Sequence, residues 1–122
     1  DGEDVTEVYN SDNVTLWAAG TTNEQKWLLS ALSSRRVLAS AVDPTYGLNV
    51  YQSGSPYNCN MHKVYKNETD ALVSFVAYSG YYKIKLYNYD LYLTVGSSSN
   101  GANVYWAASS SSNYQKWTIE EA

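Results

Sequence analysis

The sequence is poor in the residues that most catalytic and metal sites require. It contains one cysteine, Cys59, and one histidine, His62. A single cysteine excludes an intramolecular disulfide and a cysteine-based metal site. One histidine and one cysteine also supply neither a catalytic triad nor a metal cluster of the usual kind. We therefore expect no metal, no cofactor and no enzymatic activity.

Basic charge and long apolar runs are scarce as well. Eight Lys and Arg stand against twelve Asp and Glu, which gives a formal net charge of -4, and the longest basic run is Arg35-Arg36. Nucleic-acid binding depends on clustered Lys and Arg. No apolar stretch approaches the roughly 18 residues of a membrane span. The sequence therefore predicts neither a nucleic-acid partner nor membrane insertion.

Tyrosine, tryptophan and small polar residues are abundant instead. The chain has 13 Tyr and 4 Trp but one Phe, and only 16% of its residues are charged. Tyr and Trp suit half-buried strand positions and wet binding surfaces. With 44% hydrophobic residues, residues 1–122 are expected to form one all-β domain. Low charge together with a lone cysteine predicts a secreted, extracellular protein of bacterial origin.

An internal repeat is the strongest pattern in the chain. The frame Asn-x-Gln-Lys-Trp occurs at 23–27 and again at 113–117. Each is preceded by a Val, an Asn-Val pair and a Trp-Ala-Ala run: Val5, 13–14 and 17–19 in one case, Val95, 103–104 and 106–108 in the other. Val50 lies 45 residues from both Val5 and Val95. We infer three copies, at about 1–34, 35–79 and 80–122.

The middle copy is the most diverged. Asn60-Met61 is expected to take the place of the Asn-Val pair. Two segments compete for the place of the Gln-Lys-Trp frame, Asn60–Val64 and Asp70–Phe75. The second is preferred because Phe75, 48 residues after Trp27 and 42 before Trp117, keeps the period more nearly constant.

These copies resemble those of the ricin B-chain type lectins, which also occur as carbohydrate-binding modules. The resemblance rests on the polar residue before each Val, the Asn-Val-x-x-Trp strand and the closing Gln-x-Trp, and it spans nearly the whole chain. It implies a β-trefoil, with four short strands in each copy and pseudo-threefold symmetry. The first strand of copy 1 would fall ahead of Asp1, so we expect copy 1 to lack it. Another segment, chain or domain would then complete that copy.

The resemblance also implies a sugar site in copy 1, formed by Asp4, Trp17, Asn23 and Gln25. An aromatic ring packs on the C–H face of a sugar, a carboxylate accepts hydrogen bonds from two hydroxyls, and an amide both donates and accepts. Val14 and Leu16 share one strand face, so Trp17 is expected to face outward. Gln25 is expected to serve first as an architectural residue that satisfies backbone groups.

A weaker second site is expected in copy 3, and none in copy 2. Its residues are Thr94, Tyr105, Trp106, Asn113 and Gln115. Thr94 replaces the expected Asp, and a hydroxyl makes weaker, single contacts. Two registers stay open here. The shared Trp-Ala-Ala run would place Trp106 on the surface, whereas strict alternation would place it in the core and Tyr105 outside.

The expected function is non-catalytic binding of glycans or polysaccharide, of galactose type by resemblance, as a targeting module of a larger secreted protein. The alternative is a protein-interaction or assembly trefoil whose sugar sites have decayed, since two of three copies lack the Asp. A protease-inhibitor trefoil ranks third, because Gln-x-Trp repeats are not typical of that family.

Overall fold

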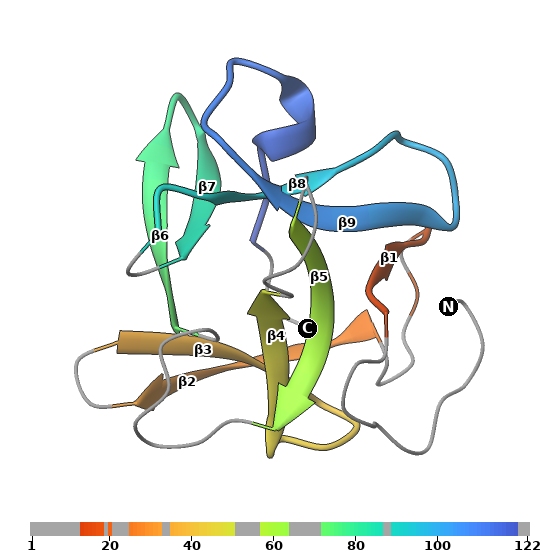
Figure 1. Ribbon diagram of the computed structural model, residues 1–122, viewed down its shortest axis with the longest axis vertical. Helices are drawn as coiled ribbons and strands as arrows, with labels where there is room; N and C mark the ends of the chain where they lie inside the picture. The colour runs from red at the N-terminus through yellow and green to blue at the C-terminus, as the bar shows by residue number, and fades with distance from the viewer. Residues whose placement is uncertain are drawn as a thin grey trace.

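The computed structural model describes residues 13–18, 20, 25–32, 35–50, 57–63, 72–86 and 89–119. Two residues of the predicted sugar site, Asp4 and Asn23, lie outside this part of the chain. The regular structure consists of short strands, joined by turns and by the 3-10 helix η2 (Asn113–Gln115). This confirms the all-β expectation (Figure 1).

Among the described residues nine strands pair with one another, and every pair is antiparallel. They are β1 (Thr15–Leu16), β2 (Trp27–Leu32), β3 (Arg35–Ser40), β4 (Tyr46–Val50), β5 (Tyr57–Lys63), β6 (Leu72–Tyr78), β7 (Tyr81–Leu86), β8 (Tyr92–Val95) and β9 (Ala102–Ala107). Most consecutive strands pair with each other, and in the β6–β7 hairpin the two-residue turn is Ser79-Gly80. Both turn residues have positive φ, 51° and 87°, which matches the twist of a tight hairpin.

The strands are arranged in three similar groups around one axis. Copy 2 contains β3 to β6, and copy 3 contains β7 to β9 followed by Trp117. In copy 2, Val37 of β3 pairs with Leu72 of β6. In copy 3, Tyr82 of β7 pairs with Trp117, and both partners lie 45 residues further along the chain. Copies 2 and 3 therefore share one strand arrangement, and the architecture is the expected β-trefoil with pseudo-threefold symmetry.

Strand register corrects both expectations for the diverged middle copy. Leu72 is the counterpart of Trp117, and it also lies 45 residues after Trp27. Leu72, rather than Phe75, therefore occupies the Trp place. The Asn-Val place is likewise held by Asn58-Cys59 rather than Asn60-Met61, because Asn58 lies 45 residues from both Asn13 and Asn103. The repeat period is therefore 45 residues throughout. Comparison of the copies by sequence missed Leu72 because an aromatic residue was expected at the position of Trp27 and Trp117.

Three asparagines close the structure at the pseudo-threefold axis. Asn13 Nδ2 donates to Asn103 Oδ1 (2.9 Å), Asn103 Nδ2 to Asn58 Oδ1 (2.7 Å), and Asn58 Nδ2 to Asn13 Oδ1 (2.7 Å). Each amide donates once and accepts once, so the three bonds form a closed ring. The backbones follow the same cycle, because Asn13, Asn58 and Asn103 pair with Asn60, Tyr105 and Thr15, respectively. We call these three side chains the asparagine ring.

The larger of two buried apolar clusters among the described residues lies against this ring. The residue after each asparagine is Val14, Cys59 or Val104, and alternation turns their side chains inward. Cys59 and Val104 are buried, and Val14 packs against them. Trp106 is 0% exposed at the centre of the same core, and its indole Nε1 donates to the Asn49 carbonyl at 3.1 Å. Trp106 thus meets the requirement that a buried polar group be hydrogen-bonded.

Cys59 should be unreactive in the folded protein. It lies in the core, and burial raises the pKa of its thiol above the usual range, so the reactive thiolate is scarce and inaccessible. We expect a thiol-specific reagent to label the native protein only as fast as it unfolds, and to label the protein at once in denaturant. Rapid native labelling would contradict the placement of Cys59 in the core.

Replacing Asn58 with alanine should destabilise the fold. The change removes one donated and one accepted hydrogen bond from the asparagine ring, so the free energy of unfolding should fall by about 1–2 kcal/mol. The double variant Asn13→Ala/Asn58→Ala should lose clearly less than the sum of the two single variants, because either change already opens the ring. Urea denaturation measures both effects, with Asn113→Ala as a surface control. Additive losses would show that the ring is not a cooperative unit.

Candidate functional site

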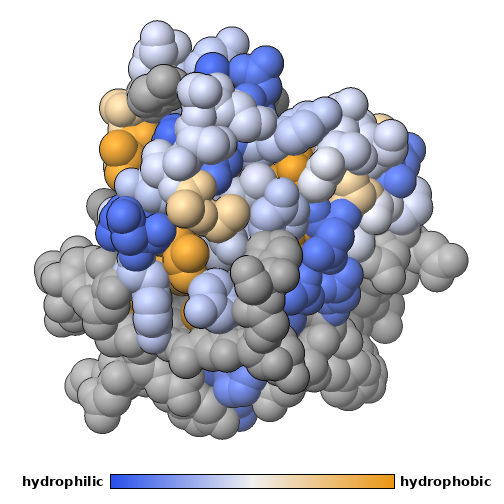
Figure 2. Space-filling model, turned by 45° about the horizontal axis from the view of Figure 1, so that its top comes forward, coloured by the Kyte–Doolittle hydropathy of each residue, from blue (hydrophilic) through white to orange (hydrophobic). Residues whose placement is uncertain are grey.

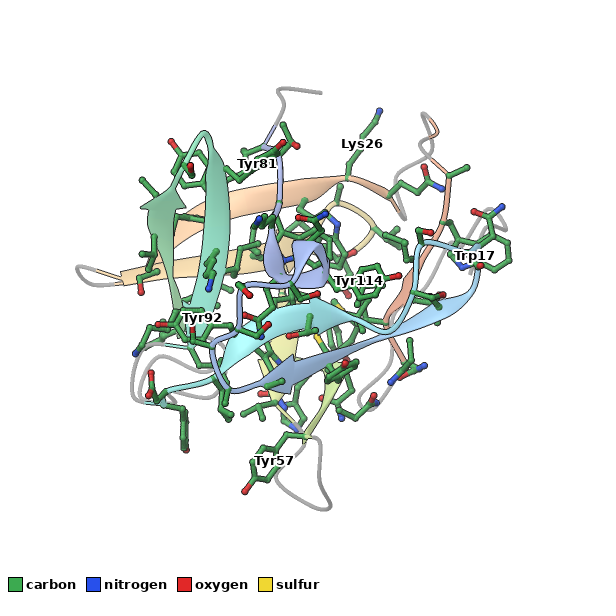
Figure 3. All side chains as sticks on the ribbon, turned by 90° about the horizontal axis from the view of Figure 1, so that it is seen from above. Trp17, Lys26, Tyr57, Tyr81, Tyr92 and Tyr114 are labelled. Carbon is green, nitrogen blue, oxygen red and sulfur yellow. The ribbon has the colours of Figure 1, made fainter. Side chains whose placement is uncertain are left out.

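Trp17 presents a large aromatic surface to solvent directly after β1. Its side chain is 37% exposed, and Figure 3 shows the indole at the periphery of the molecule. Val14 and Leu16 pack against the core. The alternation expected from the sequence is therefore confirmed, and Trp17 faces outward.

The indole is held in place by its own strand and by the tip of the β8–β9 hairpin. Nε1 of Trp17 donates to Thr15 Oγ1 at 2.8 Å. A Cβ built on Gly101 (φ 83°) would lie 3.8 Å from the indole Cζ2, so the ring packs closely beside this glycine. The hairpin tip is fixed in turn, because Gly101 N donates to the Leu16 carbonyl (2.7 Å) and Asn100 Oδ1 accepts from Ala18 N (2.7 Å).

Gln25 holds the backbone that follows Trp17 in place through a side-chain hydrogen bond. Its Nε2 donates to the Ala18 carbonyl at 3.1 Å. Its Oε1 is buried, with no hydrogen-bond partner among the residues described. A Cβ on Gly20 would come within 2.7 Å of that oxygen, so a larger residue at this position would require the Gln25 side chain to shift. The architectural role expected of Gln25 is confirmed. Of the two described members of the predicted copy 1 site, Trp17 is exposed and Gln25 is half-buried.

In copy 3, Gln115 performs the same task inside the protein. It is 1% exposed. Its Nε2 donates to the Ala108 carbonyl (2.7 Å) and to Thr94 Oγ1 (3.2 Å), while its Oε1 accepts from Ser110 N (2.9 Å). Ala18 and Ala108 are 90 residues apart, as are Gln25 and Gln115. The repeated Gln therefore closes the loop that follows the Asn-Val strand.

The expectation of a second sugar site in copy 3 is wrong for three of its residues. Thr94, Trp106 and Gln115 are buried, so a surface ligand cannot contact them. Thr94 was expected to replace a sugar-binding Asp, but its hydroxyl instead donates to the Tyr92 carbonyl at 2.8 Å and accepts from Gln115. Strict alternation decides the open register of Trp106, which is the counterpart of Leu16 and not of Trp17.

The other two residues of that second site lie nearer the surface but do not form a binding face with the rest. Tyr105 is half-buried. Asn113 is exposed, and its Oδ1 accepts from Lys116 Nζ at 3.1 Å. The positions equivalent to Trp17 are His62 in copy 2 and Ala107 in copy 3, 45 and 90 residues further on. The exposed indole is therefore a property of copy 1 and is not repeated.

Sequence reasoning missed two sets of contacts. The acceptor Thr15 and the packing partner Gly101 that orient Trp17 lie on different copies, and nothing in their spacing reveals the contact. Lys83 is a second case, since a buried lysine is rare. Its Nζ donates to Ser109 Oγ (3.0 Å) and to the Ser110 carbonyl (2.7 Å), and it lies 5.4 Å from the centroid of the Tyr92 ring.

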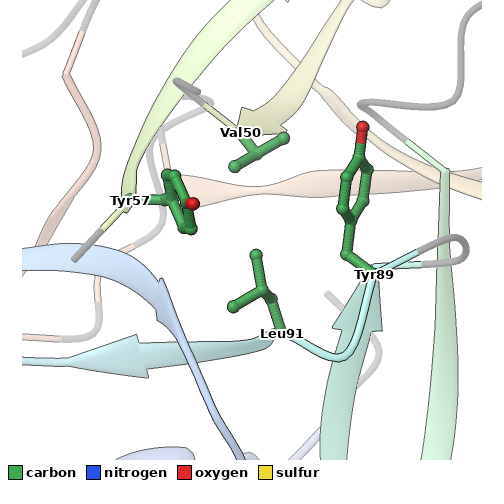
Figure 4. Close-up of a pocket in the computed structure, with 4 residues that line it drawn as sticks. All are labelled: Val50, Tyr57, Tyr89 and Leu91. Carbon is green, nitrogen blue, oxygen red and sulfur yellow. The ribbon is translucent and has the colours of Figure 1, made fainter. Parts of the chain in front are cut away.

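A small pocket opens between copies 2 and 3. It has a volume of about 130 Å³ and is lined by Val50, Tyr57, Tyr89 and Leu91. Figure 4 shows the two tyrosine rings on opposite sides, with Val50 and Leu91 between them. This volume is well below the roughly 300–1,000 Å³ of most ligand pockets. On the face drawn in Figure 2, apolar side chains form small, separate patches among polar ones. These features favour shallow recognition at the surface.

Neither a metal site nor a spanning helix is found in the part of the chain that the structure covers. No three His, Cys, Asp or Glu side chains gather there as metal ligands would. None of the helices described there is long and apolar enough to cross a membrane.

Comparison with known proteins supports the fold. The chain is similar to a designed 3-fold symmetric protein, ThreeFoil, known from its crystal structure, with a TM-score of 0.82 and 22% sequence identity. The similarity covers 96% of this chain and 86% of ThreeFoil. No family model and no curated protein match the sequence. At this identity the likeness shows the fold alone, a β-trefoil with pseudo-threefold symmetry.

Gln115→Ala should be among the more destabilising changes in this protein. It removes three hydrogen bonds from a buried amide, so we expect the free energy of unfolding to fall by about 2–4 kcal/mol. Gln25→Ala removes one bond from a half-buried amide and should cost about 1 kcal/mol. Chemical denaturation of the two variants provides the comparison. Equal losses would show that the two Gln-x-Trp loops are held by something other than these bonds.

Proposed function

We propose that the protein is a non-catalytic carbohydrate-binding module of the ricin B-chain type, with Trp17 as its sugar platform. The observation that carries the proposal is the exposed indole of Trp17, fixed by Thr15 and the Gly101 turn. A rigid ring loses little conformational freedom on binding, so more of the contact energy remains as affinity. The apolar C–H face of a sugar would pack on this ring, and galactose-type glycans are the expected class.

In this proposal Asp4 and Asn23 form the hydrogen bonds to the sugar hydroxyls. A carboxylate from Asp4 would accept hydrogen bonds from adjacent sugar hydroxyls, and the Asn23 amide would read another. Gln25 supports the site from behind through the Ala18 carbonyl. We assign no step of bond making or breaking to any residue, and we propose that the module targets a larger secreted protein to glycans.

A single platform implies weak binding by each module. Copies 2 and 3 offer His62 and Ala107 at the position of Trp17, so the trefoil would contribute one working site instead of three. Useful avidity would then come from repeated modules or from several modules on one surface.

A protein-interaction function is the second candidate, and one observation favours it. Trp27 and Leu28 are exposed at the start of β2, which within the described residues pairs only with β3. Apolar side chains in that position fit a protein contact better than a sugar contact.

Trp17→Ala should weaken sugar binding by at least about 10-fold while leaving the fold intact, because it removes the stacking surface. Trp17→Phe should retain part of the affinity. Glycan arrays identify a ligand, and titration calorimetry with that ligand measures each variant. Asp4→Ala should weaken binding through lost hydrogen bonds.

Tyr57→Ala is the matched control for this experiment. Tyr57 is also 37% exposed but lies in the small pocket between copies 2 and 3. The Tyr57→Ala variant should bind the sugar with the same affinity as the unaltered protein. If Tyr57→Ala abolishes binding and Trp17→Ala does not, the sugar lies in the pocket and the proposed site is wrong.

A further inference from the structure

Two apolar residues at the start of β2 are exposed where their counterparts in the next copy are buried. Trp27 is 39% exposed and Leu28 46% exposed. The residues 45 positions later, Leu72 and Val73 at the start of β6, are 3% and 1% exposed. The four residues have similar apolar character and lie at equivalent places in the repeat, so the difference comes from what covers them.

The covering element in copy 2 is β3. Leu72 pairs with Val37, and Val73 pairs with Arg36. β3 lies between β2 and β6, where it pairs with both. β7 occupies the same kind of place in copy 3, between β6 and Trp117. Each of these strands therefore joins the last strand of one copy to the last strand of the next.

The third such place lies between the Trp117–Ile119 segment and β2. Within the described part of the chain, β2 pairs only with β3, and no strand fills this third place. Ile119 is also exposed there. Seen from above, Lys26, Tyr81 and the end of the described chain lie on the same side of the molecule (Figure 3).

We propose that this edge, formed by Trp27, Leu28 and Ile119, binds an extended segment of another polypeptide as an added antiparallel strand. An unpaired strand edge offers a row of backbone donors and acceptors, and peptides are captured by adding a strand to such an edge. This inference is independent of the sugar site, since it involves neither Trp17 nor the residues proposed to act with it.

The sequences of β3 and β7, which occupy the equivalent places in copies 2 and 3, indicate what kind of segment would bind at this edge. Apolar residues alternate along it, as Val37 and Ala39 do in β3 and Ile84 and Leu86 do in β7. Both strands also carry two basic residues, which suits a chain with a net charge of -4. The register follows from the repeat: the residue equivalent to Val37 pairs with Trp27, and the preceding residue pairs with Leu28.

A synthetic peptide with the sequence of residues 33–42, SSRRVLASAV, tests this inference directly. We expect saturable binding of one peptide per chain and a raised melting temperature, because the ligand binds only the folded state. Hydrogen exchange should slow in β2 and in 117–119. A peptide of the same composition in scrambled order should not bind. Titration calorimetry and exchange mass spectrometry supply these measurements.

Leu28→Lys should weaken peptide binding at least about 10-fold, since it places a charge where an apolar contact forms. The matched control is Val76→Lys, which changes a similarly exposed apolar residue on β6 and should leave peptide affinity unchanged. Both residues are exposed, so both variants should fold, as circular dichroism will check. Trp17→Ala should bind the peptide normally, which separates this test from that of the sugar site.

Three outcomes would overturn the inference. The peptide fails to bind, or exchange slows in strands other than β2 and 117–119. Alternatively, sedimentation equilibrium shows a dimer of this chain that Leu28→Lys disrupts and that excludes the peptide. In that last case the occupant of the edge is a second copy of the protein.

Discussion

Closure of three strands around one axis is the constraint on which this structure depends. The asparagine ring joins one strand from each copy through side-chain amides, and the backbones of the same strands pair in the same cyclic order. A copy of about 40 residues cannot bury its own apolar face. The ring holds the three faces at a common centre, where the residue after each asparagine points into a shared core.

The repeated Gln-x-Trp frame builds on that centre by fixing the loops around it. Gln115 satisfies two backbone groups at the start of its loop, the Ala108 carbonyl and the Ser110 N–H, and Gln25 does part of the same work in copy 1. Because these amides are occupied inside the protein, they leave recognition to side chains that point outward. The Trp17 indole is such a side chain, and it is oriented jointly by copy 1 and by the β8–β9 turn of copy 3.

Divergence among the copies has changed the side chains presented at equivalent surface positions. Trp17, His62 and Ala107 occupy one repeat position, as do Trp27, Leu72 and Trp117. In the first set the outward side chain has changed, and one copy alone keeps a large aromatic platform. In the second set an apolar residue persists, but its exposure depends on the neighbouring strand. We propose that a sugar binds at the first of these differences and an added strand at the second.

The sequence alone determined the fold, because triplication leaves a constant period that survives substitution. It also determined that Trp17 faces outward and that the Gln-x-Trp amides close loops, since alternation and hydrogen-bonding capacity are local properties. Only the tertiary structure decided that Trp106, Thr94 and Gln115 are buried, that Asn58 completes the ring, and that Leu72 stands in the Trp place. Burial and register depend on the packing of residues 45 or 90 positions apart, and a strand can change its residue types without changing its partners.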